Sequence, residues 1–154
     1  MRLFLLFGNA AVVLGLALPA MAFCEPQLRL TPDEVNALPK AVAGVGTSGL
    51  PAVQTIKLVG DPAKTGPYVI RLIVAPNTTI AAHSHRDART ATVVAGLWHF
   101  GYGAKNDPAQ AKALPPGSFY TEPAGEDHFA ATTAEGAIVD ITGYGPSDTI
   151  YVKK

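Results

Sequence analysis

The chain has 154 residues with 12 basic and 12 acidic side chains, so its formal net charge is zero. It shows no run or stripe of Lys and Arg, which excludes the electrostatic footprint of a nucleic-acid-binding protein. The single cysteine, Cys24, cannot form an internal disulfide, so stability must come from the core.

The first 22 residues have the pattern of an export signal. Arg2 gives a positive start, an apolar run extends from Leu3 to Leu18, and Ala20-Met21-Ala22 offers the small residues after which a signal peptidase cuts. The run is shorter than the roughly 20 apolar residues of a membrane span. We therefore predict a cleaved signal peptide over 1–22, a periplasmic or secreted mature protein that begins at Phe23, and no stable membrane anchor.

The segment 23–52 is expected to be an N-terminal arm with one short helix. Thr31-Pro32-Asp33-Glu34 combines an N-cap, a proline at the first helical position and a glutamate three residues after the cap. This pattern predicts a helix over 32–38 that ends at Pro39. The Gly- and Ala-rich stretch 41–49 lacks periodicity and is expected to be a loop.

From Val53 onward the chain consists of short β-type runs separated by turn residues. The runs favour strands at 53–59, 68–75, 78–84, 89–95, 97–102, 118–122, 128–133, 136–143 and 149–152. No sustained helical period follows residue 40, and 105–112 is interpreted as an insertion in a hairpin. Short strands at this spacing predict one all-β domain over 53–154, a sandwich or a barrel.

Three of the four histidines stand in informative positions. His83 and His85 are two residues apart, so on a strand both side chains leave the same face. On a buried face their nitrogens need partners, and one shared metal ion would serve both. His128 follows Pro123-x-Gly125, in which proline and glycine suit a tight turn between two strands.

Together these patterns resemble the two motifs of the cupin superfamily. The His83-x-His85 pair and Gly96 match the first motif, and the stretch from Gly117 to His128 matches the second. The resemblance implies a single cupin jelly-roll barrel that follows the short helix, with one divalent metal ion on His83, His85 and His128. The three-histidine set is similar to that of the thiol and diketone-cleaving dioxygenases. The resemblance therefore favours Fe²⁺, and Zn²⁺, Mn²⁺, Ni²⁺ or Cu²⁺ are compatible.

The sequence departs from the cupin pattern at three positions. Asn77 replaces a glycine, Thr132 replaces an asparagine, and Arg89 stands where the family has a glutamate ligand. A charged arginine has no lone pair to give to a metal. At about 6 Å a divalent ion would repel it by about 5 kcal/mol. We therefore expect Arg89 to turn outward and pair with Asp87, and the alternative is that it points inward and holds an anionic substrate.

Glu122, next to the turn before His128, is the second candidate catalytic residue beside Arg89. If Glu122 faces the interior, it is a fourth ligand, a hydrogen-bond acceptor for a histidine or an acid/base. If it faces solvent, it is an ordinary carboxylate at a strand end. His99, between Trp98 and Phe100, is expected to be a packed or surface histidine.

The resulting hypothesis is an exported metal-dependent enzyme that acts on a small molecule, with dioxygenation as the expected reaction. One alternative is a non-catalytic cupin that binds or senses a small ligand or a metal. Another is a sugar isomerase or epimerase, for which the sequence offers no evident second base. Cupins often pair, so the resemblance also allows a homodimer, and the fold does not by itself decide among these functions.

Overall fold

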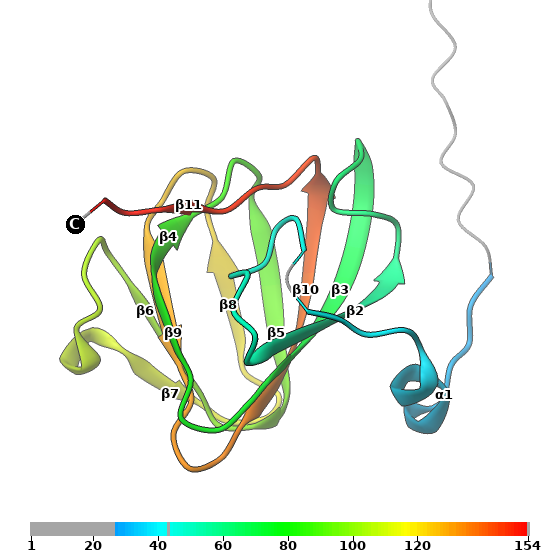
Figure 1. The fold of residues 1–154 in the computed structure, drawn as a ribbon, viewed down its shortest axis with the longest axis horizontal. Helices are drawn as coiled ribbons and strands as arrows, with labels where there is room; N and C mark the ends of the chain where they lie inside the picture. Colours follow the sequence, from blue (N-terminus) through cyan, green and yellow to red (C-terminus); the bar gives the residue numbers. More distant parts are fainter. Residues whose placement is uncertain (1–26, 43, 154) are drawn as a thin grey trace, which may run out of the picture.

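The computed structural model describes residues 27–42 and 44–153. The predicted signal peptide and Cys24 lie outside the described residues. The described chain begins with helix α1 (Pro32–Ala37), which lies outside the two sheets (Figure 1). It begins at the predicted capping box, in which the Thr31 backbone N–H donates to the Glu34 carboxylate at 2.7 Å. Within the described residues, no helix has the length and apolar character needed to cross a membrane.

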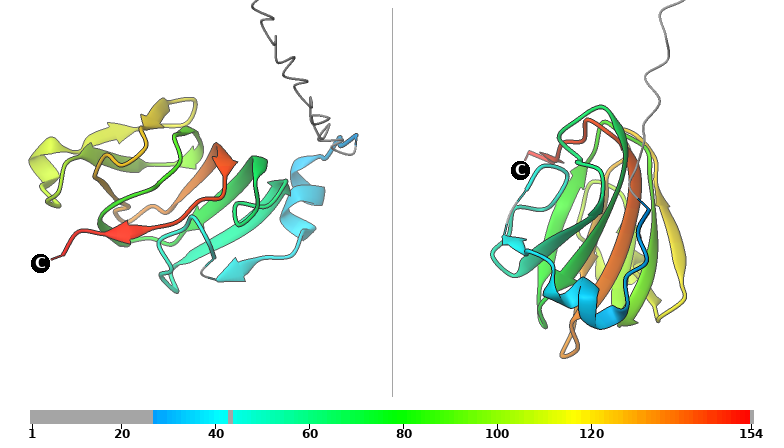
Figure 2. Two further views of the ribbon diagram at one scale, coloured as in Figure 1. Left: turned by 90° about the horizontal axis from the view of Figure 1, so that it is seen from above. Right: turned by 90° about the vertical axis from the view of Figure 1, so that its right-hand side faces the viewer.

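Two antiparallel sheets face each other and enclose the core (Figure 2). The strands are β1 (Ala41–Val42), β2 (Val53–Val59), β3 (Gly66–Val74), β4 (Thr79–Ser84), β5 (Arg89–Gly96), β6 (Trp98–Tyr102), β7 (Lys112–Leu114), β8 (Phe119–Glu122), β9 (His128–Ala131), β10 (Ala137–Gly145) and β11 (Ile150–Tyr151). The first sheet has the order β1-β2-β3-β10-β5-β8, and the second has the order β11-β4-β9-β6-β7. The expected all-β architecture with one short N-terminal helix is therefore confirmed.

Alternation along the strands decides which side chains form the core. On β3, Tyr68, Ile70 and Leu72 are buried between the sheets. Arg71, on the opposite face, pairs with Asp140 of β10 at 2.7 Å. The core thus lies between two sheets that each present one apolar face.

Some element boundaries differ from the predicted ones because of pairing between strands. Residues 41–42 form β1 instead of loop, since Ala41 lies opposite Thr55 of β2. The segment interpreted as a hairpin insertion does connect two paired strands, and it contains the 3-10 turn Pro108–Gln110. Strand β10 continues to Gly145, which is opposite Gly66 of β3.

The local backbone explains two of the departures from the cupin pattern. Asn77 has φ of 53°, a left-handed conformation that asparagine tolerates better than most residues other than glycine. The Thr132 hydroxyl accepts from the Thr78 N–H at 3.0 Å and donates to the Ala75 carbonyl at 2.7 Å. Both residues therefore maintain the turn between β3 and β4.

Candidate metal centre

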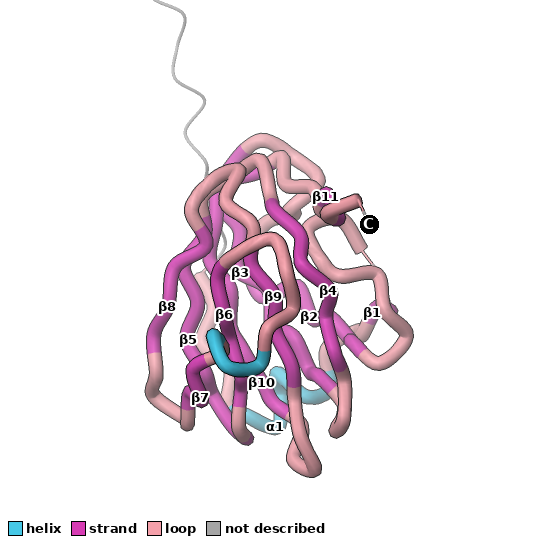
Figure 3. Tube along the Cα trace, turned by 90° about the vertical axis from the view of Figure 1, so that its left-hand side faces the viewer, coloured by secondary structure: helices cyan, strands magenta, loops and turns pink. Residues whose placement is uncertain are grey.

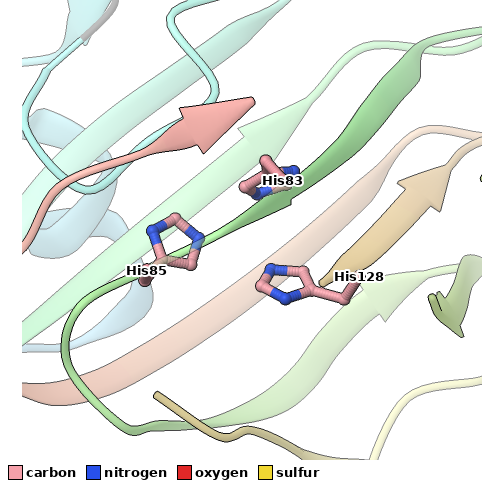
Figure 4. Close-up of side chains that lie close together, drawn as sticks. All are labelled: His83, His85 and His128. Carbon is pink, nitrogen blue, oxygen red and sulfur yellow. The ribbon is translucent and has the colours of Figure 1, made fainter. Parts of the chain in front are cut away.

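Strands β4 and β9 are neighbours in the second sheet (Figure 3), and three histidines on or next to them converge inside the fold (Figure 4). His83 belongs to β4, His85 follows its last residue, and His128 opens β9 directly opposite His83. All three side chains are buried, and one ligand nitrogen from each lies within 4.8 Å of the others. The structure thus brings together the three predicted ligands.

A β-bulge in β4 turns His83 toward the interior. Ile80 and Ala82 are already buried, so simple alternation would place His83 on the outer face. The register between β4 and β9 shifts between Ile80 and His83, which is how a bulge re-aims a side chain. The Asn106 side chain bridges the bulge, because it accepts from the Ala82 N–H at 2.7 Å and donates to the Ile80 carbonyl at 3.1 Å.

Backbone carbonyls fix the orientation of the three rings. The Nδ1 atoms bond the carbonyls of Ala81 (from His83, 2.7 Å), Glu126 (from His128, 3.1 Å) and Asp148 (from His85). Since a carbonyl only accepts, each Nδ1 carries the proton and each Nε2 presents a lone pair. The Nε2 atoms of His85 and His128 are buried and have no hydrogen-bond partner. Orphaned acceptors of this kind fit a bound metal ion.

Burial keeps these imidazoles neutral. It lowers the pKa of His83 to about 4, and repulsion from His128 acts in the same direction. It lowers the pKa of His85 to about 3, with the charge of Arg89 as the next cause. Burial also lowers the pKa of His128. The neutral form is the one that binds a metal.

Arg89 and Glu122 face the same cavity as a buried ion pair. They lie opposite each other on β5 and β8 and are only 4% and 3% exposed. Arg89 Nε donates to Glu122 Oε2 at 2.6 Å, Nη2 contacts the same oxygen, and Nη1 donates to the Gly46 carbonyl at 2.7 Å. Burial opposes ionisation of Glu122, but the charge of Arg89 holds its pKa below the ordinary value.

The expected outward pair of Arg89 with Asp87 is wrong. Asp87 is itself buried, and its carboxylate accepts hydrogen bonds from Tyr68 and Ser147, each at 2.6 Å. The interior position of Arg89 is tolerated because Glu122 neutralises it there. The interpretation of Glu122 as a solvated carboxylate is also wrong, because its side chain is buried beside Arg89. The roles proposed for an inward Glu122, as a ligand, a hydrogen-bond acceptor or an acid/base, remain open.

These side chains line a cavity of about 20 Å³. Aromatic residues and the segment 46–48 complete its wall. Two hydrogen bonds hold that segment in place, because Thr149 Oγ1 donates to the Thr47 carbonyl at 2.8 Å and the Tyr151 hydroxyl donates to the Ser48 carbonyl. A cavity of this size has room for an ion and about one water.

Sequence reasoning missed two contributors to this site. Asn106 stands in the turn sequence Lys105-Asn106-Asp107-Pro108, which signals a turn but not its partner on β4. Gly46 contributes a backbone carbonyl, for which a sequence has no signature. His99 lies on β6 and, as expected, is outside the histidine cluster.

Comparisons with known proteins identify the fold. No family model and no curated protein matches the sequence. The polyketide cyclase RemF from Streptomyces resistomycificus is similar in structure, with a TM-score of 0.64 and 16% identity over 84% of this chain and 89% of that one. An RmlC-like cupin from Shewanella frigidimarina has a TM-score of 0.57 and 16% identity over 79% of this chain and 94% of its own.

A third solved structure, of a DMSP lyase, is similar over a smaller share of its own chain. It has a TM-score of 0.52 and 22% identity, and the match covers 66% of this chain and 51% of the lyase chain. The chain thus spans about half the length of that lyase. At these identities the similarities establish the fold alone.

Proposed function

The chain has the cupin fold, and we propose that it binds one divalent metal ion on His83, His85 and His128 and acts there on a small molecule. The proposal depends most on the buried Nε2 atoms of His85 and His128, which have no hydrogen-bond partner. An unsatisfied buried polar atom costs about 1–3 kcal/mol, and a metal ion would remove this cost for both. Imidazole nitrogen suits iron, zinc, copper and nickel, and Fe²⁺ is the ion we favour.

For the reaction class we propose dioxygenation. A metal ion held by three histidines retains open positions, and when bound it would supply activation of dioxygen and polarisation of the substrate. The chain's own backbone carbonyls hold the imidazoles in one tautomer. Arg89 keeps Glu122 ionised beside the histidines, so the available role of Glu122 is that of a base or a ligand. RemF and the DMSP lyase bear the names of enzymes, so the fold is compatible with catalysis.

The second candidate function is a non-catalytic cupin that binds a metal or a small ligand. The small cavity of about 20 Å³ favours it, because a larger substrate does not fit unless part of the cavity wall moves. Glu122 and the Gly46 carbonyl already engage Arg89, which leaves fewer of its five N–H groups for an anionic substrate.

We also propose that the protein is exported to the periplasm or the medium and processed after Ala22. The support is in the sequence, where Arg2, a short apolar run and Ala20-Met21-Ala22 follow one another in the order of a signal peptide.

Metal titration tests the proposed function. Protein stripped with a chelator would be titrated with Fe²⁺, Zn²⁺ and Cu²⁺, and oxygen uptake would be followed with small thiols and diketones as substrates. We expect one equivalent of metal per chain, and we expect tight binding to be lost in His128→Ala but retained in His99→Gln. A full equivalent of metal in His128→Ala would refute the ligand set. Metal binding without oxygen uptake would favour the binding protein over the enzyme.

A further inference from the structure

We infer that Glu122 is a fourth ligand of this metal and that Arg89, in the position of the usual cupin glutamate, holds the Glu122 carboxylate in place. The inference rests on the proposed metal site. In this scheme Glu122 on β8 supplies the carboxylate ligand that the first cupin motif would place on β5. The two neighbouring strands thus carry the acid and its cationic partner in exchanged positions.

The distances favour a shared ion. Glu122 Oε2 lies 3.8 Å from Nε2 of His85 and 3.7 Å from Nε2 of His128. These separations are longer than an N–H···O hydrogen bond, which ends at about 3.2 Å. Two ligand atoms that are each about 2.1 Å from one tetrahedral ion lie about 3.4 Å apart. A shift of a few tenths of an ångström therefore brings the oxygen to the spacing of a shared ligand from each of these nitrogens.

The chemistry of the facing atoms favours a cation between them. The Nδ1 atoms of His85 and His128 hold the ring protons against backbone carbonyls, which leaves both Nε2 atoms as acceptors. An ionised carboxylate is also an acceptor only. Lone pairs that face one another across a buried gap repel, and a metal ion replaces this repulsion with attraction to each of them. The cavity beside them is large enough for an ion.

Arg89 acts on the metal through Glu122. Its Nε donates to Oε2, the oxygen that also faces the two histidines, and its Nη1 donates to the Gly46 carbonyl. These two bonds orient the guanidinium and fix the carboxylate. The negative charge of Glu122 also offsets the repulsion between Arg89 and a divalent ion. Arg89 is therefore a positioning residue in this scheme.

Zn²⁺ affinity measured by chelator competition, together with the visible spectrum of the Co²⁺-loaded protein, tests the assignment. We expect Glu122→Gln to weaken Zn²⁺ binding by more than about 100-fold, since losing a group that merely supports a ligand costs about 10–100-fold. The Co²⁺ spectrum should change with it. Arg89→Met should weaken binding less, because the ligand remains, and Arg89→Lys should keep the wild-type spectrum. The matched control is Glu135→Gln, which alters an exposed carboxylate away from the site and should bind as the wild type does.

The double variant Arg89→Met/Glu122→Gln decides between a ligand and a counter-ion. It leaves no buried unpaired charge, so it remains informative if Glu122→Gln alone does not fold, and circular dichroism checks its fold. We expect it to bind Zn²⁺ as weakly as Glu122→Gln. Wild-type affinity and spectrum in the double variant would show that Glu122 only screens Arg89, and would overturn the inference. A wild type that binds no Zn²⁺ would refute the proposed metal site and, with it, the assignment of Glu122.

Discussion

The metal-free protein should lose stability between about pH 7.5 and about pH 5, because its histidines are buried in the neutral form. In the folded chain burial lowers the pKa of His83 to about 4 and that of His85 to about 3. In the unfolded chain both return to about 6.5. As the pH falls, the unfolded state therefore takes up protons before the folded state does, and this shifts the equilibrium toward unfolding.

The expected loss is large compared with the stability of a small domain. At about pH 5 protonation favours the unfolded state by about 2 kcal/mol for each histidine, against less than about 0.1 kcal/mol at about pH 7.5. His83 and His85 together remove about 4 kcal/mol, from a total that is about 5–15 kcal/mol in most proteins. His128 adds to the loss, since burial lowers its pKa too. The pKa of Glu122 is held below its ordinary value, so its contribution is lost mainly below about pH 4.5 and does not obscure the effect.

Urea unfolding in the presence of a chelator measures this loss. Trp98, the single tryptophan, is buried and reports unfolding by its fluorescence. The variant His83→Gln/His85→Gln should lose most of the pH dependence because neither replacement titrates. Saturating Zn²⁺ should move the loss to lower pH, since the metal competes with protons for the same nitrogens. A change below about 1 kcal/mol in the metal-free wild type, or an equal change in the double variant, would refute the reasoning.

Three further predictions concern the metal site and the signal peptide. In the exchange variant Arg89→Glu/Glu122→Arg the acid returns to the usual cupin position, so its Zn²⁺ affinity in equilibrium dialysis should lie within about tenfold of the wild-type affinity. An affinity loss as large as that of Glu122→Gln would contradict this prediction. Asn106→Ala should lower the free energy of unfolding by about 1–2 kcal/mol and weaken Zn²⁺ binding, because the β4 bulge loses two hydrogen bonds. The control is Lys105→Ala, which changes an exposed neighbouring residue. Unchanged Zn²⁺ affinity in Asn106→Ala would show that the bulge holds His83 without Asn106. Intact mass spectrometry of the exported protein should give a chain that begins at Phe23, and a full-length species fixed in the membrane would contradict processing.

The sequence by itself determined the features that depend on local spacing. Thr31 and Glu34 predicted the start of α1, because a capping box involves residues within one turn. The two-residue spacing of His83 and His85 predicted that both leave the strand on one side, and the structure buries both. Motif spacing also indicated the cupin fold, because it reflects the lengths of the strands and turns.

Only the tertiary structure decided the electrostatics of the site. In the structure Arg89 shares the inner face of β5 with Ala91 and Val93, whereas the repulsion from a metal had predicted an outward position. The partner that resolves the conflict, Glu122, is 33 residues away and meets Arg89 through the register of β5 and β8. Such a register is set by the packing of whole strands, so no local pattern reveals it.

The tertiary structure also decided which side chains of β4 face the interior. Ile80 and Ala82 are buried in the structure, so regular alternation through them would put His83 on the opposite face. The bulge that reverses the alternation is held by Asn106, from a connection more than 20 residues further along the chain. The sequence alone thus determined which residues are able to bind a metal. Long-range strand pairing decided which of them meet, because it sets the distances and charges between elements that are remote in sequence.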